Sequence, residues 1–172
     1  VPCLIINFGI LALLKYILVG KGFLGIGLIL PMGISFYTFQ TMGYLIDVYR
    51  GKVSAEKNIF KMALFTSYFP LLVQGPISDY KKLTETLYTP AHFSAKNFLF
   101  GFERVLWGYF KKLVIADRLI AAVTTITGDP SEYYGAYAFL GMILYAIQLY
   151  ADFTGGIDIT IGISQMLGIR LQ

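Results

Sequence analysis

The sequence predicts an all-α, polytopic integral membrane protein. Of its 172 residues, 56% are hydrophobic and only 14% are charged, whereas a soluble domain carries about a quarter charged residues. Several uncharged stretches approach the roughly 20 residues that a membrane-spanning helix needs. The chain is also rich in Phe and Tyr, with 14 and 13 copies against one Trp, and Tyr favours surfaces where an apolar wall meets water.

The distribution of charge and the cysteine content argue against a nucleic-acid-binding site and a metal site. The net charge is +4, and the basic residues are scattered without a sustained run, so we expect no nucleic-acid partner. Cys3 is the single cysteine, and the paired Cys or His residues of a metal site are missing from the sequence. The chain begins at Val1 and stops at Gln172, in the sequence "GIRLQ". We therefore expect residues 1–172 to be one partial membrane domain, truncated at both ends.

The first two apolar stretches are Leu4–Val19, interrupted only by Lys15, and Gly22–Ile46, which carries no charge. Pro31 and Gly33 predict a kink in the second stretch. Hydroxyl and amide side chains, Gln40 among them, follow in its second half. Such groups either line a tunnel or hold neighbouring helices together, and the sequence leaves both open.

A short and interrupted apolar segment comes next. Met62–Ser78 is uncharged but contains Pro70 and the "QGP" sequence that begins at Gln74. This pattern predicts a broken or re-entrant helix that lines a cavity. The flanking sequences "DVYRGKVSAEKN" and "DYKKLTETLYTPAHFSAKN" are expected to be polar loops. Both can lie on the cytoplasmic side only if the segment between them is re-entrant, which we favour.

The stretch Phe98–Leu119 is amphipathic. Its charged residues, except one, fall within an arc of about 140° on a helix; they are Glu103, Arg104, Lys111, Asp117 and Arg118, with Lys112 outside the arc. This predicts either a helix at the membrane interface or a span with one stripe facing a wet interior. The sequence "TITGDPSEYY" after it is expected to be a turn.

Two carboxylates stand in the last apolar region, "YAIQLYADFTGGIDITIG". Tyr145, Gln148 and Asp152 share one helix face at i, i+3 and i+7. We expect the pair Gly155-Gly156 to end the span Tyr133–Ala151. Asp158 then either N-caps a second helix, Ile159–Ile169, or has a functional role. Asp152 is a functional-site candidate because ionisable groups are costly at membrane depth, or it pairs with a cation of another helix.

The chain's one histidine, His92, lies in the sequence "YTPAHFSA", which is expected to be an exposed loop. The sequence contains no nucleophile elbow, phosphate-binding loop or dinucleotide-binding fingerprint. The residues alone therefore provide no convincing general base.

Four stretches together resemble the bacterial branch of the membrane-bound O-acyltransferase family, which includes alginate O-acetylases and D-alanine transferases. They are "PMGISFYTFQTMGYLIDVYRG", "YFPLLVQGPISDY", "GYFKKLVIAD" and "YAIQLYADFTGGIDITIG". The resemblance runs from about Pro31 to Gln172, with the motifs in the family's order and at similar spacing.

The resemblance implies helices around a tunnel in a multi-pass protein of the bacterial inner membrane. An acyl group, most simply acetyl, would pass from coenzyme A or a carrier-protein thioester to a hydroxyl of an exported polysaccharide or wall polymer, with other export proteins as possible partners. No cofactor is expected to stay bound. The family's base is an intramembrane histidine that follows the last motif, so we expect it beyond Gln172 and assign no catalytic residue within the chain.

Supporting residues are carried over by resemblance. Gln148, Tyr150, Asp152 and Asp158 match the family pattern Q-x-Y-x-D-F-x-G-x-x-D, although Ile157 stands where many members have Ser. We expect these four, with Gln40 and Gln74, to line or support the tunnel. Two rival functions stay open. A transporter or channel would explain broken helices and aspartates but predicts an inverted repeat, and a non-catalytic scaffold would not need a carboxylate at Asp152.

Overall fold

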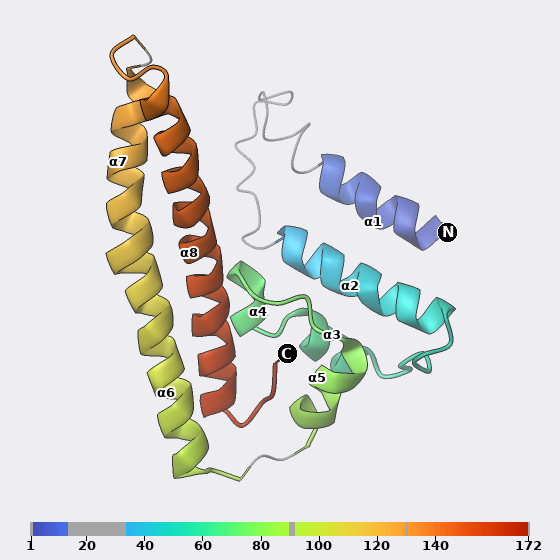
Figure 1. Cartoon of the computed structure of the whole chain (residues 1–172). Helices are drawn as coiled ribbons and strands as arrows, with labels where there is room; N and C mark the ends of the chain where they lie inside the picture. Colours follow the sequence, from blue (N-terminus) through green and yellow to red (C-terminus); the bar gives the residue numbers. More distant parts are fainter. Residues whose placement is uncertain (1, 14–33, 90–91, 130, 172) are drawn as a thin grey trace, which may run out of the picture. The chain divides into compact units, whose positions relative to one another are not determined.

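The structure, a computed structural model, describes residues 2–13, 34–89, 92–129 and 131–171, and all its regular elements there are helices (Figure 1). The described chain forms two compact units, one of residues 1–92 with 169–172 and one of residues 93–168. The predicted all-α class is confirmed for these residues. The two predicted N-terminal spans fall partly on residues 14–33, and Pro31 and Gly33 lie outside the described residues.

The described residues of the first unit form five helices: α1 (Pro2–Ala12), α2 (Ile34–Tyr49), α3 (Ile59–Thr66), α4 (Pro70–Val73) and α5 (Tyr80–Leu87). The loop predicted at residues 47–58 is confirmed from Arg50 on, where Gly51 takes a positive φ of 71° that favours glycine and turns the chain out of the helix, whereas residues 47–49 still belong to α2.

The segment Met62–Ser78 is broken, as predicted. Helix α3 ends at Thr66, and Pro70 opens the short helix α4. Proline is tolerated at the first helical position because its missing N–H would have no helical partner there. Gln74 is extended and ends α4.

The prediction that "DYKKLTETLYTPAHFSAKN" is a loop was wrong in its first half, which forms α5. The Asp79 carboxylate caps this helix by accepting from the Lys81 backbone N–H at 2.9 Å. Tyr80 and Leu83 are buried, and the Tyr80 ring packs at centroid distances of 4.6 Å from Tyr44 and 4.8 Å from Phe65. One apolar side therefore anchors a helix in which five of the eight residues are Lys, Thr or Glu.

The second unit is a long helical hairpin. Helix α6 (Ala95–Tyr109), the π-helical segment η2 (Phe110–Ala116) and α7 (Asp117–Gly128) form one continuous run. This run lies antiparallel along α8 (Ala136–Met166) (Figure 1). The turn predicted at residues 125–134 is confirmed for its described residues from Asp129 on, whereas residues 125–128 are the last turn of α7.

The predicted break at Gly155-Gly156 was wrong, since α8 continues through both residues to Met166. These glycines instead lie where the backbones of the two arms approach each other. A Cβ added to Gly108 would lie 2.7 Å from the Gly155 carbonyl oxygen, and one on Gly155 would lie 2.9 Å from the Gly108 oxygen. Gly101 and Gly162 repeat this contact one heptad away at 2.6 Å. The two backbones approach closely because these positions lack side chains.

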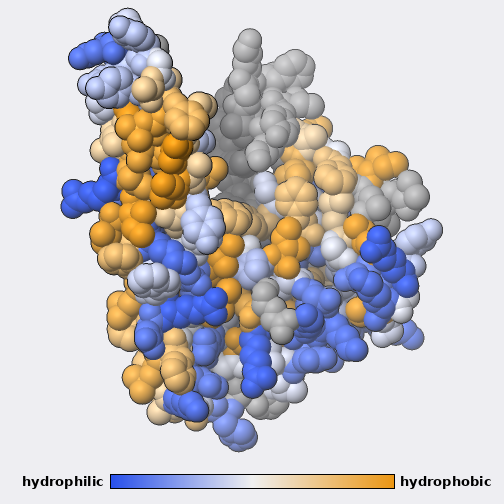
Figure 2. Space-filling view, viewed as in Figure 1, coloured by the Kyte–Doolittle hydropathy of each residue, from blue (hydrophilic) through white to orange (hydrophobic). Residues whose placement is uncertain are grey.

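The outer surface of the hairpin is apolar. Figure 2 shows hydrophobic side chains covering its upper part, and Phe139, Ile147 and Leu149 are 63%, 47% and 52% exposed. In the described part of the chain, α8 alone is long and apolar enough to cross a membrane. These features fit an all-α membrane protein.

Substitution of Gly108 tests the close approach. Gly108→Ala is expected to lower the free energy of unfolding of the full-length protein by about 1–3 kcal/mol, because the added methyl meets the backbone of Gly155 and Ile159 as well as the Ile159 side chain. Gly43→Ala is the matched control in α2, where an added Cβ meets nothing within 4 Å. It should be neutral or stabilising by up to about 1 kcal/mol. Equal thermal unfolding of the two variants in detergent would contradict the packing described.

Candidate functional site

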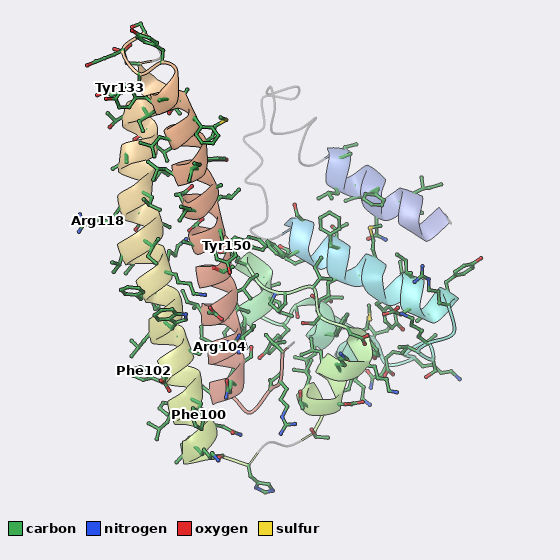
Figure 3. The ribbon with its side chains drawn as sticks, viewed as in Figure 1. Phe100, Phe102, Arg104, Arg118, Tyr133 and Tyr150 are labelled. Carbon is green, nitrogen blue, oxygen red and sulfur yellow. The ribbon has the colours of Figure 1, made fainter. Side chains whose placement is uncertain are left out.

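Asp158 lies within α8 and binds two cations of the opposite arm. Its Oδ1 accepts from the Arg104 Nε at 3.0 Å, and its Oδ2 accepts from the Lys111 Nζ at 2.5 Å; Figure 3 labels Arg104 on α6. The Asp158 side chain is 14% exposed. The N-cap alternative was wrong, because the helix that Asp158 would begin is already continuous at this position.

Asp152 forms a separate ion pair with Lys112, whose Nζ donates to the Asp152 Oδ1. Both side chains are 38% exposed. The alternative that Asp152 pairs with a cation of another helix is confirmed, and the partner comes from this chain. The two aspartates thus differ. Asp158 is mostly buried and binds two cations, whereas Asp152 is partly exposed and binds one cation.

The π-helical segment lets neighbouring lysines serve different aspartates. A π-helix has more residues per turn than an α-helix, so successive side chains rotate by a smaller angle. Lys111 and Lys112 both reach α8, although an ideal α-helix puts Lys112 outside the charged arc. Three cations of the amphipathic stretch therefore face a protein neighbour, whereas the two predicted alternatives had the charged stripe facing the membrane interface or a wet interior. Arg118 instead projects away from α8 (Figure 3).

The other motif residues do not gather on one face of α8. Gln148 is half-buried and lies one helical turn before Asp152. Tyr150 is 70% exposed, and at two positions from Asp152 it lies about 200° around the helix. The family pattern is thus spread over several sides of α8.

Gln40 and Gln74 belong to the first unit. Gln40 is buried, and its Nε2 donates to the Phe65 carbonyl oxygen at 3.4 Å. This hydrogen bond joins α2 to α3, so Gln40 holds helices together, one of the two alternatives for it. Gln74 is half-buried at the end of α4.

His92 is exposed and non-helical, as predicted. Nothing in the structure marks it as a general base. Among the described residues, no group of three or more His, Cys, Asp or Glu side chains is placed to hold a metal ion.

Sequence reasoning missed a polar cluster around Glu56 in the first unit. The Glu56 backbone N–H donates to the Tyr44 hydroxyl at 2.8 Å, and the Tyr80 hydroxyl donates to the Glu56 Oε2 at 3.3 Å. The backbone N–H of Asn58 lowers the pKa of Glu56, and burial raises the pKa of Tyr80. These bonds fix the loop after α2 against α5. The cluster combines distant residues, so no local pattern signals it.

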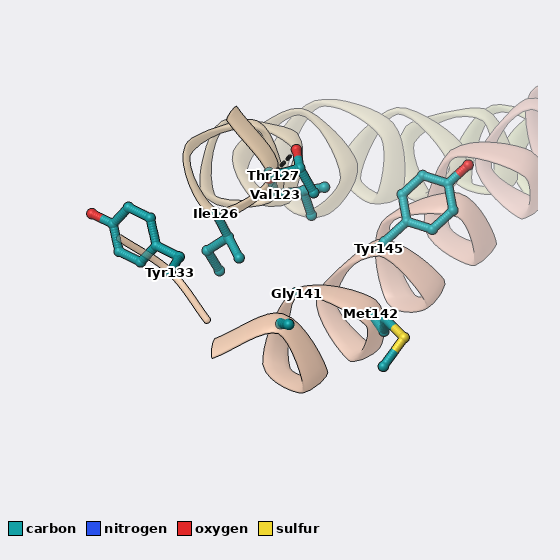
Figure 4. Close-up of a pocket in the computed structure, with 8 residues that line it drawn as sticks. Val123, Ile126, Thr127, Tyr133, Gly141, Met142 and Tyr145 are labelled. Carbon is teal, nitrogen blue, oxygen red and sulfur yellow. Dashed lines mark hydrogen bonds between the residues drawn. The ribbon is translucent and has the colours of Figure 1, made fainter. Parts of the chain in front are cut away.

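An apolar cavity of about 510 Å³ lies between α7 and α8 near the hairpin turn (Figure 4). Among the residues that line it, Tyr133 and Tyr145 provide hydroxyls, and the Thr127 hydroxyl donates to the Val123 carbonyl at 2.8 Å. The rest of the lining is apolar: Val123, Ile126, Ala138, Gly141 and Met142. The cavity suits an apolar group and offers no charged side chain for chemistry.

Comparisons with known proteins complete the description. No protein-family model matches the chain. It is 38% identical over 152 residues, 84% of its length, to "Probable alginate O-acetylase AlgI" of Pseudomonas aeruginosa. It is 30% identical over 170 residues to the peptidoglycan O-acetyltransferase of Helicobacter pylori. It is 23% identical over 151 residues to the teichoic acid D-alanyltransferase of Bacillus subtilis. The chain spans 28%, 32% and 36% of these relatives, respectively.

Removing each aspartate tests the difference between the two ion pairs. Asp158→Asn leaves the Lys111 ammonium, which is 18% exposed, and the Arg104 guanidinium, which is 43% exposed, without their shared carboxylate, so we expect a loss of about 2–3 kcal/mol in unfolding free energy. Asp152→Asn breaks a half-exposed pair and should cost about 1 kcal/mol or less. Thermal unfolding of the full-length variants in detergent measures both losses. A loss at Asp152 as large as that at Asp158 would contradict the assignment.

Proposed function

We propose that this chain, which belongs to the membrane-bound O-acyltransferase family, is part of an enzyme that acylates an exported polysaccharide or wall polymer. The relatives confirm the family resemblance of the four motifs. The observation that carries the proposal is the 38% identity, over 84% of the chain, to a protein named as an alginate O-acetylase. The acyl group is most simply acetyl.

The proposed reaction is acyl transfer from a thioester to a hydroxyl. The acceptor oxygen attacks the thioester carbonyl carbon, a C–O ester bond forms and the C–S bond breaks. A general base takes the hydroxyl proton, which ends on the departing thiol. The donor is coenzyme A or a carrier-protein thioester. By the family resemblance we place the base, an intramembrane histidine, beyond Gln172.

We assign the hairpin of α6, η2, α7 and α8 to the wall of a tunnel in a multi-pass protein of the bacterial inner membrane. The length and exposed apolar surface of α8 support this placement. The enclosed Asp158 is a structural residue in this proposal. Gln148 and Tyr150 are proposed to support or line this tunnel. For Gln40 and Gln74 of the first unit, a tunnel-lining or supporting role is proposed from the family resemblance alone.

Asp152 is the proposed positioning residue. It keeps one cation partner and is 38% exposed, so a further group can still hydrogen-bond to its carboxylate. A carboxylate in contact with an imidazole fixes its tautomer and stabilises its protonated form. We propose that Asp152 does this for the catalytic histidine.

A transporter or a scaffold is less well supported. The aspartates that favoured a transporter have cation partners within the hairpin, so they need no transported ion to balance them. The relatives are named as transferases, which favours an enzyme over a scaffold.

Asp152→Asn in the full-length protein tests the positioning role. Transfer of labelled acetyl to the polymer is expected to fall about 100-fold or more while the protein remains at normal levels in the membrane. Losing the carboxylate lowers the pKa of a contacting imidazole, so the acidic limb of the pH–rate profile should move to lower pH. A merely structural role would not shift the profile.

His92→Ala is the control for this experiment, because its side chain lies exposed in a loop. Its transfer rate should stay within about twofold of the unmodified protein. Near-normal transfer by Asp152→Asn would exclude the positioning role, and loss of the protein from the membrane would assign Asp152 to folding.

A further inference from the structure

Helix α3 of the first unit has an exposed apolar face. At about 100° per residue, Ile59, Phe60, Ala63 and Leu64 fall within an arc of about 140° around the helix. All four are exposed, and the Ile59 and Phe60 side chains are 81% and 87% exposed. Phe65 lies on the opposite side of α3 and is buried. One side of the helix therefore packs into the first unit, and the other side, the α3 outer face, presents large apolar side chains outward.

Two lysines border the α3 outer face. Lys57 directly precedes the N-cap residue Asn58, and Lys61 follows Phe60 on the helix. Both lysines are exposed, and among the described residues neither forms an ion pair. The Lys61 Nζ lies 5.2 Å from the centre of the Tyr88 ring, a cation–π contact that does not neutralise its charge.

The charge beside this face favours an anion. Residues 47–61 hold four basic and two acidic side chains, a net charge of +2: Arg50, Lys52, Lys57 and Lys61 against Asp47 and Glu56. Asp47 pairs with Lys52 at 3.4 Å. The Glu56 carboxylate accepts from the Asn58 backbone N–H and the Tyr80 hydroxyl, and its charge also acts on Lys61. Two positive charges therefore remain without a matching carboxylate in this segment.

Hydrogen bonds hold the start of α3 in place. The Asn58 side chain caps the helix by accepting from the backbone N–H groups of Phe60 and Lys61 at 2.9 and 3.4 Å. The Lys61 carbonyl oxygen accepts from the Tyr88 hydroxyl at 2.8 Å. The apolar side chains and the lysines are thus presented together by a fixed backbone, so a partner can bind them without first ordering the segment.

A lipid surface matches this arrangement better than a protein partner does. Lysine is depleted in the cores of protein–protein interfaces. Helices that lie in the membrane interface instead place large apolar side chains among the acyl chains and carry basic residues along the edge of that face. The long lysine side chains then extend toward the headgroups.

We infer that α3 lies in the membrane interface and that Lys57 and Lys61 bind the headgroups of anionic phospholipids. Ile59 and Phe60 then lie among the acyl chains. Each lysine near an anionic surface strengthens the attraction several-fold, so the α3 outer face selects anionic over neutral lipids. The inference uses the placement of the chain in a membrane and is independent of its acyl-transfer chemistry.

A photoreactive side chain at position 60 identifies what this face touches. The full-length protein with Phe60→p-benzoylphenylalanine is placed in vesicles of phosphatidylcholine with a minor share of phosphatidylglycerol, irradiated and analysed by mass spectrometry. We expect phospholipid adducts in which phosphatidylglycerol exceeds its share of the vesicle lipid by about threefold or more. The excess should fall in high salt, because ions screen exposed charges.

The lysines are tested by adding Lys57→Gln and Lys61→Gln to the same protein. Lipid adducts at position 60 should persist, with phosphatidylglycerol reduced to its share of the vesicle lipid. The matched control, Lys81→Gln with Lys96→Gln, removes the same charge from exposed positions outside residues 47–61 and should keep the excess.

A second probe, Phe139→p-benzoylphenylalanine, reports on an apolar site without neighbouring lysines, since residues 119–151 contain no Lys or Arg. Phe139 is exposed on α8. This probe should label both lipids in proportion to the vesicle composition. An unchanged yield of its adducts in the Lys57 and Lys61 variant shows that the variant remains folded in the membrane.

Four results would overturn the inference. They are adducts of position 60 with protein in place of lipid, no adduct at all, phosphatidylglycerol at its bulk share with the lysines intact, and an equal loss of the excess in the Lys81 and Lys96 control. The assay needs no acyl donor or acceptor. A protein that proved inactive in acyl transfer would therefore contradict the proposed function and leave this result unchanged.

Discussion

The close approach of two helix backbones is the constraint on which the second unit depends. At Gly108 and Gly155 the space between the arms is too small for a Cβ, and Gly101 and Gly162 repeat this condition. Association of helices in a membrane cannot rely on the hydrophobic effect, because lipid is as apolar as a leucine side chain. Packing without side chains at the contact, together with charge pairing, can replace that driving force.

The ion pairs follow from this approach. With the backbones in contact, the side chains that flank the glycines reach across the seam, and the carboxylates of α8 meet cations of α6 and η2. An unpaired carboxylate at membrane depth would be costly. The pairing therefore explains how α8 carries Asp152 and Asp158 and remains continuous. From their unequal partners and exposure we infer a structural role for Asp158 and propose a functional role for Asp152.

The sequence predicted the features that depend on composition and local pattern. The all-α class, the broken segment after α3 and the exposed loop of His92 required only apolar runs, proline and glycine. The family resemblance rested on four motifs and is supported by the relatives. The roles assigned to Gln74, Gln148 and Tyr150 remain predictions.

The errors arose where a residue's effect depends on its neighbours in space. Gly155 can end a helix or admit a second backbone, and only the partner helix decides between these. Helix α5 is stabilised by its Asp79 cap and a buried edge, although its composition resembles a loop. The partner of Asp152 was missed because the π-helical turns bring Lys112 onto the inner face. An ion pair at Asp152 was among the predicted alternatives, but Lys112 was not named as its partner.

The most direct measurement is an electron cryo-microscopy map of the full-length protein in a lipid nanodisc, at a resolution that shows side chains. The account predicts a continuous α8 through Gly155-Gly156, with the Asp158 carboxylate bound by Arg104 and Lys111. A helix that ends at the glycine pair, with Asp158 capping a new helix and the two arms apart, would contradict the account.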